Sequence, residues 1–164
     1  MELRLQTQFE QCARLAAWLA DAGKAVAGSG PLTVDRVAAP SPTDADLFDL
    51  LLYRYMRMQD ALGGRLLPTL LEAGGELPVE SAYIDKLNQL ERLGIVGSAA
   101  RWMELRALRN RMAHDYPDSD VRLGILREAL TSVPELLATY TAARRYASEK
   151  LGLALAVGTP PDRT

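Results

Sequence analysis

The side chains best suited to chemistry in this chain gather in one short segment, LRNRMAHDYPD, at residues 108–118. The segment contains Arg109, Asn110, Tyr116 and the one histidine of the chain, His114. The imidazole of histidine has an unperturbed pKa of about 6.5, so it can both donate and accept a proton near neutral pH. Any acid–base catalysis by an imidazole in this protein must therefore use His114.

The composition of the chain is that of an ordinary globular domain. Its 164 residues suffice to bury a core, and 48% of them are apolar and 24% charged. The formal net charge of -2 lacks the positive excess of a protein that coats nucleic acid, so any contact with RNA would be local. The single cysteine, Cys12, excludes an intramolecular disulfide and offers too little thiolate for a zinc knuckle, so we expect a cytoplasmic protein without a metal.

We expect no membrane signal in the first helix. The expected first helix is interrupted by four charged side chains, which are Arg4, Glu10, Arg14 and Asp21. Such a helix is neither the apolar core of a signal peptide nor a membrane span, so we expect no membrane partner. We predict a single domain over residues 1–157 and a flexible C-terminal tail over residues 158–164.

Apolar residues recur three or four positions apart along most of the chain, which is typical of amphipathic helices. We expect a first helix that ends between Gly23 and Gly30, then a loop rich in glycine and proline. We expect the second helix to begin at a cap formed by Thr43 with Asp46 and to break or kink near Gly63, Gly64 or Pro68. The third helix is expected to stop at Gly94. We expect the fourth helix to run from a cap at Ser98 to about Tyr116. The fifth helix is expected to begin at a cap formed by Asp118 or Ser119 and to continue past a kink at Pro134.

No run of alternating apolar and polar residues is long enough for a sheet, and the chain contains no internal repeat. Amphipathic helices of this kind bury their apolar faces by packing against one another. The third helix, for example, presents Ile84, Leu87, Leu90 and Leu93 on one face. The fold class predicted by the sequence is therefore all-α, an antiparallel bundle of about five helices.

Arg109 occupies an unusual position on the expected fourth helix. At about 100° per residue it falls within the apolar arc formed by Trp102, Leu105, Leu108, Met112, Ala113 and Tyr116. A guanidinium there must be paired, reach water or face something other than its own core, because an unpaired buried charge is costly. Arg106, Asn110 and His114 are spaced four apart and form a polar stripe beside this arc. His114 falls in the last turn, where the helix dipole favours the imidazolium form.

Arginine and histidine together suffice to cleave RNA without a metal. An imidazole can handle the proton of the 2′-hydroxyl or of the leaving oxygen, while a guanidinium stabilises the charge of the phosphorane. On a regular helix, however, Arg109 and His114 are about 140° apart, so one helix positions them poorly for one phosphate. Two copies of the helix facing each other across a twofold axis would solve this, which predicts a homodimer.

Less specific interpretations apply to the same residue types. A lone histidine near a helix end is more often a capping or exposed residue than a catalyst. Arg57 and Asp60 on the second helix can support the site, although such residues more often form a solvated or ion-paired face. Trp18 and Trp102 lie at helical spacing from other apolar residues and are expected in the core rather than stacked on bases.

Three segments, ELRALRNRMAHDYP, IDKLNQLERLGIV and LLYRYMRMQDAL, closely resemble the HEPN superfamily. The closest resemblance is to HepT-like toxins of toxin–antitoxin modules, and it covers roughly residues 44–150. It implies an all-α bundle that forms a homodimer, with a metal-independent ribonuclease site at the interface built from an R-x4-H-x-Y motif. Arg109, His114 and Tyr116 match that motif, and Asn110 commonly follows the motif arginine in these proteins.

The resemblance also implies a partner and a form of regulation. HepT-like toxins are paired with a minimal nucleotidyltransferase antitoxin, which transfers AMP from ATP to the motif tyrosine and so disarms the toxin. Tyr116 matches that tyrosine and would be the acceptor here. The added nucleotide would bring a phosphate that can pair with Arg109.

Three functions of different classes remain open from the sequence. The first is an endoribonuclease toxin that needs no cofactor, with Arg109 and His114 catalytic and with Asn110, Arg106, Arg57 and Asp60 in support. The second is a non-catalytic subunit that presents substrate to a nucleotidyltransferase, and the third is a helical scaffold. The intact motif favours the ribonuclease.

Overall fold

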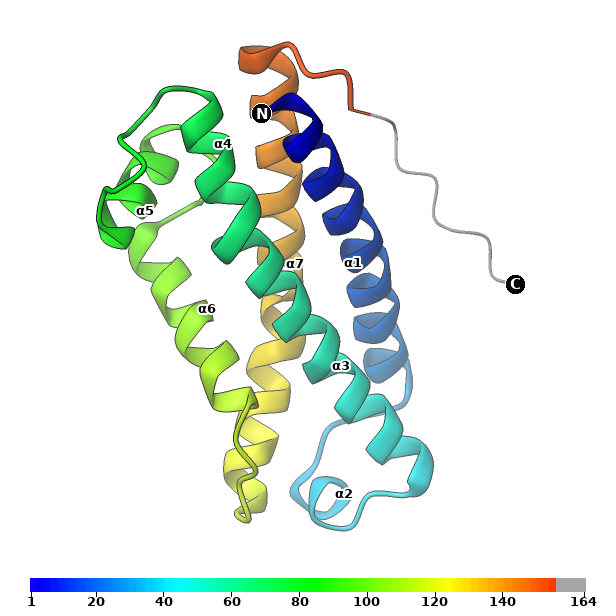
Figure 1. The fold of residues 1–164 in the computed structure, drawn as a ribbon. Coiled ribbons are helices and arrows are strands. Elements are labelled where there is room, and N and C mark those ends of the chain that lie inside the picture. The colour runs from blue at the N-terminus through cyan, green and yellow to red at the C-terminus, as the bar shows by residue number, and fades with distance from the viewer. Residues whose placement is uncertain (156–164) are drawn as a thin grey trace.

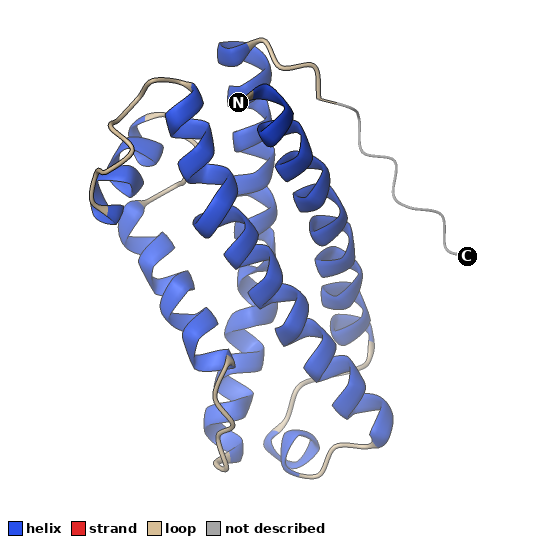
Figure 2. Ribbon diagram, in the orientation of Figure 1, coloured by secondary structure: helices blue, strands red, loops and turns tan. Residues whose placement is uncertain are grey.

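Helices make up every regular element of the structure, a computed structural model that describes residues 1–155 (Figures 1 and 2). They are α1 (Glu2–Gly28), α2 (Val34–Ala38), α3 (Pro42–Ala61), the π-helical turn η1 (Leu62–Leu66), α4 (Leu67–Ala73), α5 (Tyr83–Arg92), α6 (Ala99–Met112) and α7 (Ser119–Leu151). Because α3, η1 and α4 follow one another without a break, residues 1–155 form five long helical segments, α1, α3–η1–α4, α5, α6 and α7, and the short helix α2. The predicted all-α bundle is confirmed; the expected domain end at residue 157 and the tail lie outside the described residues.

Three of the predicted helix boundaries depend on local chemistry and are confirmed. Ser98 Oγ accepts a hydrogen bond from the backbone N–H of Arg101 (3.2 Å) at the start of α6. The carboxylate of Asp118 accepts two backbone N–H groups at the start of α7. Gly94 follows α5 with a φ of 70°, a left-handed conformation that glycine adopts without strain. The chain also continues through Pro134 within α7.

The predicted cap of the second helix is wrong. Ser41, not Thr43, caps α3, and its hydroxyl accepts a hydrogen bond from the backbone N–H of Asp44 (3.1 Å). Pro42 occupies the first helical position, where its missing N–H costs nothing and its fixed φ suits the helix. The helix therefore begins one residue before Thr43.

The expected break in the second helix is a π-helical turn, η1, that contains Gly63 and Gly64. A Cβ atom on Gly63 would lie only 3.1 Å from Trp102 Cζ2 and 3.2 Å from Tyr83 Oη, so a side chain there would displace its neighbours. Trp102 Nε1 in turn donates a hydrogen bond to Tyr83 Oη (2.9 Å). The glycine thus lets α5 and α6 pack closely against this turn.

The region expected to be a loop contains the short helix α2. Thr33 caps it by accepting the backbone N–H of Arg36 (3.3 Å), and Val37 is buried. The guanidinium of Arg36 also binds the carboxylate of Asp44, and its Nε lies 3.0 Å from Oδ2. These contacts fix α2 beneath the start of α3, at the end of the bundle where α6 passes into α7 (Figure 1).

The predicted core is largely correct, but Trp18 and Ile84 are not in it. Trp102 is 2% exposed as expected, whereas Trp18 is 42% and Ile84 50% exposed. The buried face of α1 contains Cys12, Leu15 and Leu19, and Trp18 lies beside this face. A helical period indicates which residues share a face, but not how wide a face the neighbouring helices will cover. Within residues 1–155, no helix combines the length and the apolar character that crossing a membrane requires.

Candidate functional site

The motif histidine lies just beyond its helix rather than within it. The expected helix end near Tyr116 is wrong, because α6 ends at Met112. Ala113, which we placed in the apolar arc, is the C-terminal cap residue and is exposed. The backbone N–H of His114 still bonds the carbonyl of Arg111 (3.2 Å) in the turn that follows. Pro117 favours an extended residue before it and has no N–H to close another helical turn. His114 and Tyr116 are therefore carried by the connection from α6 to α7.

Arg109 is paired with Asp60 on α3. Its Nε lies 2.7 Å from Oδ1 and its Nη2 2.7 Å from Oδ2, so the contact is bidentate. The hydrogen bonds and the charge of the Asp60 carboxylate raise the pKa of Arg109 above its usual value. The Arg109 side chain is 28% exposed, and its Nη1 has no partner within the described residues, so an incoming phosphate can reach it.

His114 and Tyr116 lie together on the rim of a groove. Their ring centroids are 6.1 Å apart with the planes at 72°, an edge-to-face contact. His114 is exposed and Tyr116 half-buried. The groove has a volume of about 440 Å³ and lies between α2, α3, the α6–α7 connection and α7; its lining includes Val37, Phe48, Asp49, Leu52, His114, Tyr116, Arg122 and Ile125.

The other candidate residues differ in their surroundings. The guanidinium carbon of Arg106 lies 4.5 Å from the centre of the Tyr83 ring, a cation–π contact with the start of α5. Asn110 and Arg57 are exposed, and in the described part of the chain neither side chain forms a hydrogen bond or an ion pair. Of the four supporting candidates, Asp60 is the one whose side chain forms hydrogen bonds and an ion pair with a motif residue within residues 1–155.

One face of α3 contacts Arg109 and also lines the groove beside His114. Asp60 binds Arg109, while Asp49 and Leu52 line the groove that His114 borders. Asp49 and Asp60 differ by about 20° around the helix, so they lie on one face of α3. Leu52 and Asp60 are about 12 Å apart along it at ~1.5 Å per residue. Across residues 1–155, no hydrogen bond or ion pair joins the Arg109 pair to the His114 pair.

The groove itself and two of its polar residues were not predicted from the sequence. Arg122 donates from Nη2 to the carbonyl of Val37 (3.0 Å), whereas its Nε is buried and has no partner among the described residues. Asp49 is exposed and, in the same part of the chain, unpaired. Neither residue belongs to a recognisable motif, because the groove exists only where α2 docks against α7.

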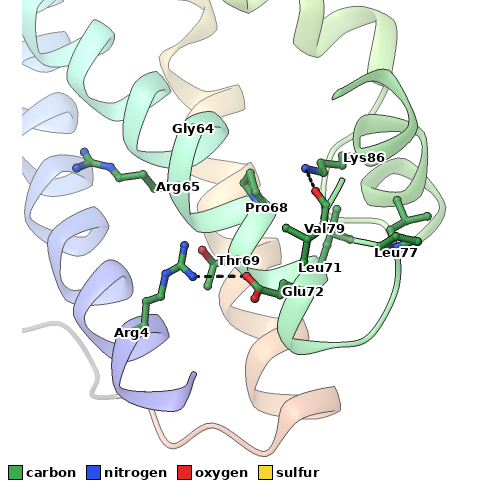
Figure 3. A pocket seen from close by; sticks show the side chains of 11 residues that line it. Arg4, Gly64, Arg65, Pro68, Thr69, Leu71, Glu72, Leu77, Val79 and Lys86 are labelled. Atoms are coloured by element: carbon green, nitrogen blue, oxygen red, sulfur yellow. Dashed lines mark hydrogen bonds and ion pairs between the residues drawn. The ribbon is translucent and has the colours of Figure 1, made fainter. Parts of the chain in front are cut away.

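A second, smaller hollow of about 150 Å³ lies near the start of α1 (Figure 3). The start of α1 is at the end of the bundle opposite α2 (Figure 1). Its lysine and one of its arginines are engaged within the protein: Lys86 Nζ donates to the carbonyl of Val79 (2.8 Å), and Arg4 Nη1 lies 3.5 Å from Glu72 Oε2. None of the motif residues reaches it. Among residues 1–155, no group of three or more His, Cys, Asp or Glu side chains is placed to hold a metal ion.

The arrangement at the α6 end combines two chemistries on one surface. Arg109 is a fixed and accessible cation that can bind an anionic phosphate, and His114 is an exposed group that can transfer protons. Tyr116 places a phenol beside the imidazole. Comparisons of the chain with protein-family models, with curated proteins and with solved structures find no match.

Proposed function

We propose that this protein is a metal-independent endoribonuclease, a HepT-like toxin of the HEPN type that works as a homodimer in the cytoplasm. The observation that carries the proposal is the state of the motif side chains. Arg109 is held in a fixed orientation by Asp60, and His114 is exposed on the same end of the bundle. A helical scaffold needs neither feature.

In the proposed reaction the ribose of the RNA supplies the nucleophile. The 2′-oxygen attacks the adjacent phosphorus, the bond to the 5′-oxygen breaks, and the products are a 2′,3′-cyclic phosphate and a free 5′-hydroxyl. His114 takes the proton from the 2′-hydroxyl or gives one to the leaving oxygen. Arg109 stabilises the extra negative charge of the phosphorane, and Asp60 holds the guanidinium for that task.

Purified protein is expected to cleave single-stranded RNA in the presence of a chelator. The reason is that an imidazole and a guanidinium together supply both proton transfer and charge stabilisation. Mass spectrometry of the products should find 2′,3′-cyclic phosphate ends. Complete inhibition by the chelator, with recovery on adding a divalent cation, would contradict the mechanism.

The protein is expected to be a homodimer in which α6 lies near the twofold axis. Because the Arg109 pair and the His114 pair are not joined within one protomer, a second copy can complete the site. Exposed apolar side chains are available for such a contact: Met103, beside the polar stripe on α6, is 41% exposed, and Ile84 on α5 is 50% exposed. Analytical ultracentrifugation at micromolar concentration measures the association.

A mixed dimer tests whether the site is shared. Coexpressed Arg109→Ala and His114→Ala chains should recover part of the cleavage that each loses alone, because the mixed dimer retains one intact arginine and one intact histidine in a shared cleft. A monomer that still cuts RNA would contradict the dimeric site, and a mixed dimer without activity would place both groups on one protomer.

A non-catalytic subunit of a nucleotidyltransferase is the second candidate. The observation that favours it is that Asp60 already occupies two donors of the Arg109 guanidinium. In that case the protein would bind the nucleotidyltransferase but show no RNA cleavage that depends on Arg109 or His114.

A further inference from the structure

The groove beside His114 has the character of a small-molecule binding site. Its volume of about 440 Å³ falls within the range of ligand pockets, and most of its walls are apolar or aromatic. Phe48 and Leu52 come from α3, and Ile125 comes from α7. Tyr116 adds an aromatic ring at the rim, next to His114, the proposed proton-transfer residue.

Three polar groups in the walls lack partners within residues 1–155: the carboxylates of Asp49 and Asp115 and the Nε of Arg122. The Asp49 carboxylate is a hydrogen-bond acceptor that, among the described residues, forms no hydrogen bond or ion pair. The Nε–H of Arg122 is a donor that is buried without a partner in the same part of the chain. Because buried polar groups in proteins are nearly always hydrogen-bonded, an unpartnered donor in the wall of a groove is unusual. The groove therefore offers the Asp49 carboxylate from α3, the Asp115 carboxylate from the α6–α7 connection and the Arg122 guanidinium from α7.

We propose that this groove binds the base of the nucleotide that adjoins the scissile phosphate, and that Asp49 selects bases with an exocyclic amino group. The proposal rests on the ribonuclease function proposed above. Proteins recognise single-stranded RNA by placing unstacked bases against aromatic side chains and reading their edges with hydrogen bonds. Adenine, cytosine and guanine each carry an amino group that can donate to a carboxylate, and uracil carries none. The guanidinium of Arg122, which also lines the groove, then donates to a ring nitrogen or carbonyl of the same base.

The base preference is tested with single-stranded RNA oligonucleotides that differ at one nucleotide beside the mapped cleavage position. For the unmodified protein, kcat/KM with adenine, cytosine or guanine at that position should exceed the value with uracil by about 5- to 100-fold. The difference should appear mainly in KM, because the base is held and does not react. In Asp49→Asn the ratio should fall to within about twofold, since an amide presents a donor as well as an acceptor.

A second pair of variants tests the groove independently of Asp49. Ala45 lines the groove and is half-buried, and Ala45→Phe should fill it and raise KM for all substrates. Ala142→Phe is the matched control, because Ala142 is also half-buried but lies on α7 away from the groove. The control should retain the KM and the base preference of the unmodified protein, and circular dichroism reports whether both variants are folded.

Calorimetric titration with AMP and with UMP separates this proposal from the ribonuclease proposal. AMP should bind more tightly than UMP, and the difference should disappear in Asp49→Asn. If RNA is cleaved with equal rates at all four bases, or with the same preference in Asp49→Asn and Ala45→Phe, the base site is wrong and the ribonuclease stands. If no RNA is cleaved but AMP binding depends on Asp49 and Ala45, the groove binds a base as proposed, whereas the ribonuclease function and the place of that base beside a scissile phosphate are wrong. Absence of both the preference and the binding overturns the base site.

Discussion

Replacing His114 with alanine is expected to lower kcat for RNA cleavage by about 100- to 10,000-fold, the usual contribution of general acid–base catalysis. The variant should remain folded, because His114 is exposed and lies in the turn after α6 rather than in the core. Initial rates with a defined oligonucleotide measure the loss, and thermal unfolding followed by circular dichroism measures the stability. Undiminished cleavage by folded His114→Ala would contradict the proposed role.

Arg109→Ala is expected to cause a loss of similar size for a different reason, since removing a donor that stabilises the charge of a transition state typically costs 100- to 1,000-fold in kcat. Arg111→Ala is the matched control on the same helix. Arg111 Nη1 lies 3.3 Å from Glu128 Oε2 in an exposed ion pair, and losing such a pair changes stability by at most about 1 kcal/mol. Cleavage by Arg111→Ala should therefore stay near the unmodified rate.

Asp60→Asn distinguishes a positioned arginine from a merely charged one. The amide keeps its size but accepts only one of the two hydrogen bonds from Arg109, so the guanidinium should lose part of its orientation. A reduction in kcat smaller than that of Arg109→Ala, with little change in KM, is the expected result. A reduction in the free energy of unfolding with no change in kcat would make Asp60 a structural residue only.

Coexpression with a minimal nucleotidyltransferase is expected to add one or more AMP units to Tyr116 and to abolish RNA cleavage. In that step Tyr116 Oη attacks the α-phosphorus of ATP, pyrophosphate leaves, and the phenolic proton passes to solvent. Tyr116 is half-buried beside His114, and no partner for its hydroxyl is found within residues 1–155. In the proposed dimer, the attached phosphate would occupy the position of the scissile phosphate in the shared cleft and pair with an Arg109 guanidinium there.

Intact-mass measurement detects the added AMP, which should be absent from Tyr116→Phe. Tyr53→Phe is the control, because Tyr53 is 56% exposed on α3 and should not be modified. If the mass increase persists in Tyr116→Phe, another residue is the acceptor. If the nucleotidyltransferase blocks cleavage with no mass change, it acts by covering the site.

The sequence by itself determined the features that depend on neighbouring residues. The apolar period predicted the helices, and the caps at Ser98 and Asp118 and the stop at Gly94 were correct because each is made within a few residues of chain. The sequence also predicted Arg109 and His114 as the catalytic pair, and this stays a prediction. The requirement that Arg109 be paired, exposed or turned away from its core also followed from its helix position alone.

Only the tertiary structure decided which of those alternatives holds. Arg109 is paired with Asp60, which lies 49 positions away in the chain, and no local pattern specifies that contact. The exposure of Trp18 and the formation of the groove depend on which faces the neighbouring helices cover and on how α2 docks. A local pattern determines which residues share a face of a helix, whereas packing between distant segments determines what that face meets.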